Sequence, residues 1–402
     1  MKTALFIGFL ACLSVFFLFS QETTESSQTQ ITVPVRVVEG GHFVDSLTRE
    51  DFELLEDGKP QKIQALYLVR KSDIQRQEAD QEYSPELNRT FYFLFQMIEH
   101  NPRLVEMIDQ LFNQVLLPGD AMILQTPMKT YSLSPRAMAT KPKKVMADEM
   151  NSILKKDIKM GNSDYESIIR ELKRIIRNIA GTSAMADVEF GASGGDSIGM
   201  EFQLHRYRDL LEKMDASRLI DSKKILGFAS AMQGIKGQKH IFFVYQREFR
   251  PEMQLTVLNM LQSMYQDDPN IIDGLQDLFG YYSRDVTLNV DLLNKAFADS
   301  SVNFNLIFMN QEPKDVSGIS MREQSEDVFR AFSQVAQATG GTVDTSQNPV
   351  AGFQNAVKNA ETFYLLYYSP EDYKKDRQFK SITVRVKRPN CSVFHRMGYF
   401  AT

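Results

Sequence analysis

The stretch Phe91-Tyr92-Phe93-Leu94-Phe95 is almost entirely apolar and aromatic, and it decides the fold class. A short run of this kind suits a strand of a parallel sheet, because such strands are buried on both faces. Comparable runs recur at residues 239–245 and 303–309, and segments with helical spacing stand between the runs, as at 102–116 and 322–339. This alternation predicts an α/β fold, a Rossmann-like and mostly parallel sheet with helices on both faces.

A small β-rich module is expected ahead of this domain, over residues 31–70. Its first segment, residues 31–38, is dominated by β-branched side chains and partly alternates between apolar and polar residues. Asp57-Gly58 is a strong hairpin signal, because both residues tolerate a positive φ. Residues 71–88 are polar and charged, which indicates a linker, so the α/β domain should span 89–402.

Residues 137–218 differ from the rest of the α/β domain and are expected to form a helical insertion. Lysines, methionines and acidic residues are interspersed there with apolar residues at helical spacing. Methionine side chains adapt to irregular partners, so Met185, Met200 and Met214 are candidate partner-binding residues. The alternative is that these methionines pack on the sheet domain.

The N-terminus has the pattern of an export signal. Lys2 supplies a positive charge, and an uninterrupted apolar run from Ala4 to Phe19 follows it. Because the run is short for a membrane-spanning helix, residues 1–20 are expected to be a cleaved signal peptide and 21–30 a polar tether. The mature protein would then be periplasmic or secreted, with no membrane insertion. A retained N-terminal anchor is the alternative.

Composition narrows the classes of function. The chain has 402 residues, of which 43% are hydrophobic, and its formal net charge is −5. This mild acidity argues against a nucleic-acid partner, which is normally bound through a basic stripe. Removal of the signal peptide leaves one cysteine, Cys391. An internal disulfide is therefore excluded, and the fold must depend on core packing.

Several short stretches follow one another in a characteristic order along the chain. The stretches are Val33-Pro34-Val35, residues 43–47, Asp51-Phe52, Glu56-Asp57-Gly58-Lys59-Pro60-Gln61, the aromatic run at 91–95, Leu117-Pro118-Gly119-Asp120, Thr339-Gly340-Gly341, Tyr367-Tyr368-Ser369-Pro370 and Arg396-Met397-Gly398-Tyr399-Phe400. Together they cover most of residues 31–402, and in this order they give the chain a resemblance to the bacterial von Willebrand factor type A-related (VWFA-related) family. The resemblance implies a von Willebrand A-like α/β domain that binds a partner and performs no chemistry.

The resemblance also implies a Mg²⁺ site at the carboxyl end of the central sheet, and this sequence departs from the expected ligands. The family's Asp-x-Ser-x-Ser loop would fall at Gln96, Ile98 and His100, and isoleucine has no oxygen to offer a hard cation. The acidic ligand expected after the strand at 240–245 is represented only by Glu248. We therefore predict a degenerate metal site and no cofactor.

Two other functions stay open beside this interpretation. One is a metal-dependent adhesion-type module with a shifted Mg²⁺ site on Glu99 and Glu248. The other is a hydrolase using Cys391 and His395, although strand spacing places this pair on one face but well apart. The leading interpretation is an exported, non-catalytic module that binds a protein partner or serves as a scaffold.

Overall fold

The computed structural model describes residues 29–402, except for 81–82, 186–194, 219–221, 283–287 and 314–317. The expected signal peptide, residues 1–20, and most of the expected tether, 21–30, lie outside the described residues. Within the described part of the chain, no helix is both long enough and apolar enough to cross a membrane.

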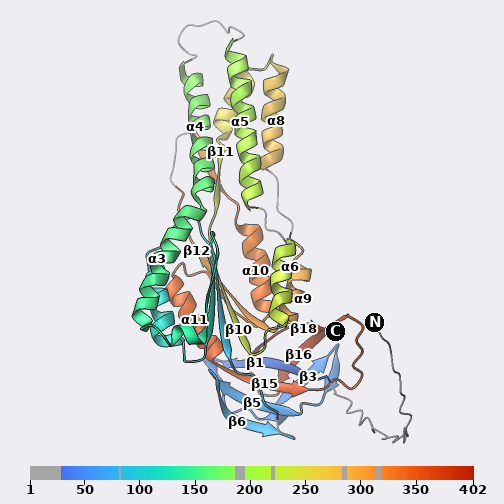
Figure 1. Cartoon of the computed structure of the whole chain (residues 1–402). Coiled ribbons are helices and arrows are strands. Elements are labelled where there is room, and N and C mark those ends of the chain that lie inside the picture. The colour runs from blue at the N-terminus through green and yellow to red at the C-terminus, as the bar shows by residue number, and fades with distance from the viewer. Residues whose placement is uncertain (1–28, 81–82, 186–194, 219–221, 283–287, 314–317) are drawn as a thin grey trace, which may run out of the picture.

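The α/β domain is built on a sheet whose strands lie in the order β14-β12-β10-β7-β8-β9 (Figure 1). The strands are β7 (Arg89–Gln96), β8 (Ala121–Gln125), β9 (Thr130–Leu133), β10 (Gln238–Gln246), β12 (Val302–Met309) and β14 (Val343–Asp344). Neighbours pair in parallel, except β8 with β9, which pair antiparallel. In β10 every residue from Lys239 to Gln246 is buried, as expected for a strand covered on both faces. The predicted α/β class is confirmed.

Alternate side chains of the central strands enter two hydrophobic cores, because successive residues of a strand face opposite sides. Phe91, Phe93 and Phe242 enter the first core, and Tyr92 and Ile241 enter the second. Helices α1 (Arg103–Gln110), α3 (Lys143–Gly161) and α11 (Pro349–Glu361) cover the first face, and α6 (Ser222–Gln233), α9 (Val290–Asp299) and α10 (Glu326–Ala338) cover the second. A π-helical turn, Leu111–Val115, extends α1, and the short α2, Pro135–Met138, precedes α3.

A β-sandwich lies below the α/β domain in Figure 1. Its first sheet has the order β17-β1-β15-β5-β6, with β2 also paired to β1, and its second has the order β18-β16-β3-β4. The bounds are β1 (Ile31–Glu39), β2 (His42–Phe43), β3 (Phe52–Glu56), β4 (Lys59–Gln61), β5 (Ala65–Arg70), β6 (Asp73–Ala79), β15 (Thr362–Tyr368), β16 (Phe379–Val386), β17 (Cys391–His395) and β18 (Gly398–Phe400), with a 3₁₀ turn at Arg49–Asp51. Side chains from both sheets share one hydrophobic core.

This sandwich corrects the expected domain boundaries. The module is not formed by residues 31–70 alone, and the α/β domain does not run to 402, because β1 pairs on both sides with strands from 362–395. The expected linker at 71–88 is also wrong in part, since β6 lies within it and pairs with β5. Pairing between strands more than 300 residues apart leaves no trace in local patterning, which explains the error in the domain boundaries. The linker error has another cause, because β6 is mostly polar and lies at a sheet edge.

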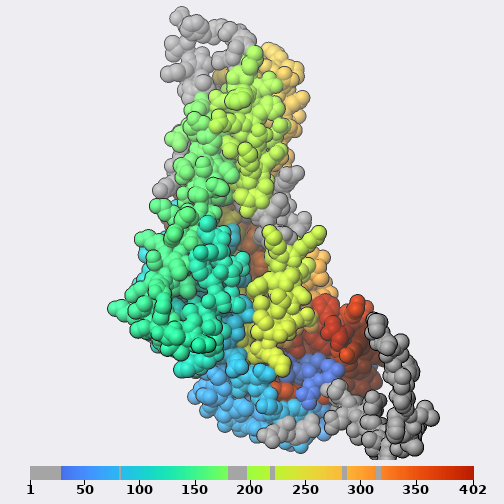
Figure 2. Space-filling model, viewed as in Figure 1, coloured from blue at the N-terminus to red at the C-terminus, as the bar shows by residue number. Residues whose placement is uncertain are grey.

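A helical stalk rises from the α/β domain on the side opposite the sandwich (Figures 1 and 2). It contains α4 (Ser163–Met185), α5 (Gly195–Arg218), α7 (Leu255–Met264) and α8 (Pro269–Tyr282), and a ribbon of β11 (Phe249–Met253) with β13 (Ile319–Glu323). The expected single insertion at 137–218 is thus corrected. Its first part, α3, packs in the core of the α/β domain, while α4 and α5 join helices that lie outside the expected range.

Candidate functional site

The resemblance places a cation at the carboxyl edge of the central sheet, and there the side chain of Gln246 binds the backbone instead. Gln246 ends β10, is buried, and lies on the strand next to β7, which ends at Gln96. Its side-chain Oε1 accepts hydrogen bonds from the backbone N–H groups of Ile98 and Glu99, at 2.9 Å each. The turn that would carry metal ligands is therefore held by a neutral amide oxygen.

The side chains at this edge do not fit Mg²⁺, which requires several oxygens in octahedral geometry. Gln96 is exposed and Ile98 offers no oxygen, while burial, with Lys155 nearby, lowers the pKa of His100 and favours a neutral imidazole. The two carboxylates of the alternative, shifted Mg²⁺ site also lie in different environments, because Glu99 is exposed and Glu248 is buried. Across the described residues, no three His, Cys, Asp or Glu side chains form a group able to hold a metal.

Two of the three methionines expected to contact a partner, Met200 and Met214, lie in the interior of the stalk. Met200 and Met214 are buried with Leu204, Tyr207 and Leu211 of α5, in a core shared with α4, α7 and α8. The side chain of Met185 lies outside the described residues. Met200 and Met214 are therefore buried within the stalk, because a four-helix arrangement covers the face on which they lie, and a role for them in partner binding stays a prediction.

Cys391 and His395 do not form a nucleophilic pair. Nδ1 of His395 donates to the carbonyl of Arg396 at 2.8 Å, and Nε2 accepts from the backbone N–H of Val384 at 3.2 Å. Both ring nitrogens are thus engaged by backbone, and burial lowers the pKa of this imidazole. Without a free nitrogen, His395 has no lone pair with which to take a proton from Cys391.

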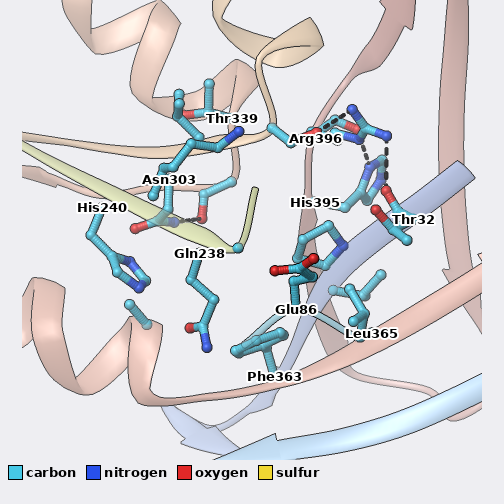
Figure 3. Close-up of a pocket in the computed structure, with 18 of the residues that line it drawn as sticks. Thr32, Glu86, Gln238, His240, Asn303, Thr339, Phe363, Leu365, His395 and Arg396 are labelled. Carbon is cyan, nitrogen blue, oxygen red and sulfur yellow. Dashed lines mark hydrogen bonds between the residues drawn. The ribbon is translucent and has the colours of Figure 1, made fainter. Parts of the chain in front are cut away.

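A cavity of about 610 Å³ lies at the opposite, amino edge of the sheet, where the sandwich meets the α/β domain. We call it the amino-edge cavity. It is bounded by β1 and β15 on one side and by the starts of β10 and β12 on the other. Figure 3 shows Thr32, Phe363 and Leu365 facing Gln238, His240 and Asn303 across it, with Glu86 between them.

Two buried arginines line the amino-edge cavity. Arg36 of β1 is 8% exposed, and Arg396, which follows β17, is 7% exposed. Arg396 donates to the carbonyl of Thr32 at 2.8 Å and to the hydroxyl of Ser301, so it bridges the sandwich and the α/β domain. Nε of each guanidinium is buried without a hydrogen-bond partner among the described residues.

The starts of β10 and β12 add further nitrogen groups to the cavity. Lys239 donates from Nζ to the carbonyls of Met232 and Ile235, and burial lowers the pKa of Lys239 to about 8. Burial, together with the charge of Arg89, lowers the pKa of His240 to about 4, which leaves the imidazole neutral at pH 7. Its Nδ1 has no hydrogen-bond partner among the described residues.

Sequence reasoning missed the amino-edge cavity. Its strongest available signal was Arg36, a charged residue in the middle of the β-branched segment 31–38. An arginine there faces either solvent or a second layer, and only the tertiary packing of β1 over the sheet edge shows which. The other lining groups come from segments far apart in sequence and carry no shared motif.

Comparisons with known proteins add little to this geometry. None of the known protein families matches the sequence, and no curated protein matches it. Among solved structures, the crystal structure of the human COPII-coat protein Sec24c is similar to this chain with a TM-score of 0.33 and 7% sequence identity. The similarity covers 79% of this chain and 44% of the Sec24c chain. A likeness at this level carries no argument about function.

Proposed function

We propose that this protein is an exported, non-catalytic module of the VWFA-related type that binds a protein partner through its helical stalk. The support for the von Willebrand A-like assignment is the order of the motifs along the chain, together with a largely parallel sheet covered by helices on both faces. The proposal includes no reaction and no cofactor.

One observation carries the proposal: Gln246 holds the turn at the carboxyl edge of the sheet, and this edge continues into the stalk. Gln246 accepts both amides of the turn after β7. Directly beyond it, β10 continues into β11, whose partner β13 follows β12. Ligands of α/β sheets bind outside the carboxyl ends of the strands, so an element rising from that edge is well placed to take over contact with a partner.

The stalk also carries apolar side chains on its outer surface. Ile198 and Phe202 lie one turn apart on α5 and are 69% and 65% exposed, while Leu255 begins α7 and is also exposed. Single exposed apolar residues are ordinary, but two on adjacent turns of a solvated helix form a patch. We assign this patch, Ile198 with Phe202, as the centre of the partner contact.

The test replaces both patch residues with aspartate, Ile198→Asp with Phe202→Asp. Leu292→Asp is the matched control, since Leu292 is an exposed apolar residue on α9, in the α/β domain. The immobilised mature protein should retain a defined species from the exported fraction of the producing cells, and the control should retain it equally. The patch variant should lose it, with melting temperature unchanged. Equal retention by the patch variant, or equal loss with the control, would refute the assignment.

A further inference from the structure

The amino-edge cavity contains a positive charge that no described side chain balances. Arg36 is buried, and the described residues place no carboxylate within ion-pair distance of it. Its Nη1 donates to the carbonyl of Asn359 at 3.1 Å, and its Cζ lies 4.4 Å from the ring centroid of Phe394. A buried charge without a counterion is costly, and this one lies beside open space instead of packed side chains.

Most of the other charged side chains around the cavity are also positive. Lys236, Lys239 and Arg396 line it, and Glu86 is the one carboxylate among the described lining residues. Glu86 is already paired with Lys236 at 3.2 Å, on the exposed rim. Asp299 lies behind Arg396 and Lys239 and offsets part of their charge, but not that of Arg36. The field in the cavity therefore favours an anion.

The cavity also has an apolar wall. Phe363, Leu365 and Tyr367 of β15 line it on the sandwich side, and Val302 and Ile235 line it on the other. Its volume lies within the range of sites for small organic molecules. A guanidinium fork matches the geometry of a carboxylate, and the apolar wall suits a hydrocarbon body.

We propose that the amino-edge cavity binds a small organic carboxylate, whose carboxylate pairs with Arg36 and whose apolar body lies along Phe363 and Leu365. The site lies at the opposite end of the sheet from the stalk, so it is independent of the proposed partner contact. Because its walls come from both the sandwich and the α/β domain, the ligand would join the two and stabilise the whole chain.

A tryptophan placed in the cavity tests the proposal directly, because the natural chain contains none. Phe394→Trp places an indole beside Arg36, at a ring position that is 38% exposed. Phe202→Trp on the stalk is the matched reporter far from the cavity. Octanoate should change the fluorescence of Phe394→Trp in a saturable, one-to-one manner and leave Phe202→Trp unchanged. The uncharged 1-octanol should bind at least about tenfold more weakly, because it lacks the charge-assisted hydrogen bond.

Arg36→Met, made in the Phe394→Trp background, separates ligand binding from a structural role of Arg36. It should weaken octanoate binding at least about tenfold while the melting temperature of the free protein stays the same or rises. In the Phe394→Trp protein that retains Arg36, saturating octanoate should raise the melting temperature, because only the folded chain binds it.

Several results would overturn the proposal. If octanoate and 1-octanol bind with equal affinity, the charge of Arg36 does not contribute to binding. If inorganic phosphate binds as tightly as octanoate, the apolar wall does not contribute. Absence of any response to octanoate at millimolar concentration, in a folded Phe394→Trp protein, would remove the site. A large fall in melting temperature for Arg36→Met with octanoate affinity retained would show that Arg36 is structural.

Discussion

At the scale of single residues, the stretch Leu117-Pro118-Gly119-Asp120 proves to be a structural device. Asp120 is buried and accepts from Nε of Arg89 at 3.0 Å and from the backbone N–H of Leu117 at 2.7 Å. Gly119 has a φ of 97°, which a side chain would oppose. The motif therefore anchors Arg89 at the start of β7.

His240 gives the protein a pH dependence whose sign follows from its buried position. Its pKa is lowered from 6.5 to about 4, so between these values the unfolded chain binds a proton that the folded chain rejects. The free energy of unfolding should therefore fall as the pH decreases from about 6.5 to about 4, by roughly 3 kcal/mol from this group. His240→Phe keeps the stacking on Phe91 and removes the titration.

Urea unfolding of both proteins across this pH window measures the effect. His100 and His395 titrate in both proteins, so the difference between wild type and His240→Phe isolates His240. The advantage of wild type over the variant should shrink toward acid pH. If the free energies of unfolding of wild type and of His240→Phe stay parallel from pH 7 to pH 4, His240 is not held neutral by the fold.

At the scale of elements, the sequence predicts the strands that are buried on both faces and misses a strand that is not. The aromatic run at 91–95 becomes β7, and the runs at 239–245 and 303–309 become β10 and β12, because a continuous apolar run has few other uses. β6 looks like a linker, since five of its seven residues are polar or charged and it lies at a sheet edge. Helical spacing in 137–218 was visible, but the partners of those helices were not.

The closed carboxyl edge predicts the outcome of a cation titration. Gln246 already satisfies the amides of Ile98 and Glu99, and the described residues place no group of three metal-binding side chains beside it. Millimolar Mg²⁺, Mn²⁺ or Ca²⁺ should leave the melting temperature of the chelator-treated protein unchanged, because a bound cation would raise it. Glu248→Gln is the companion variant. A rise in wild type that this variant abolishes would instead establish the shifted adhesion-type site.

At the scale of the whole molecule, strands from the first and last parts of the described chain pair with one another. β1 lies between β15 and β17, so the first described strand is completed by the end of the chain. Arg396 ties Thr32 to Ser301, and the backbone N–H of Phe400 donates to Asp299 of α9 at 2.8 Å. Sandwich and α/β domain therefore share hydrogen bonds as well as the amino-edge cavity, and we expect them to unfold together.

Tyr364 offers a test of this coupling. Its hydroxyl donates to the carbonyl of Val44 at 2.8 Å and accepts from the N–H of Leu47 at 3.1 Å, across 320 and 317 residues of sequence. Tyr364→Phe leaves both groups buried and unpaired, and should cost about 1–3 kcal/mol in the free energy of unfolding. Tyr373→Phe, whose hydroxyl bond is exposed, is the control and should cost little.

Hydrogen exchange then shows how far the loss of Tyr364 spreads. If the chain is one cooperative unit, exchange through global unfolding should speed up equally in β1 and in β10, because both report the same free energy. Faster exchange in β1 and β3 with β10 unchanged would mean that the sandwich opens alone. The amino-edge cavity would then lie between two units that separate, and a ligand bound there would be expected to restore the coupling.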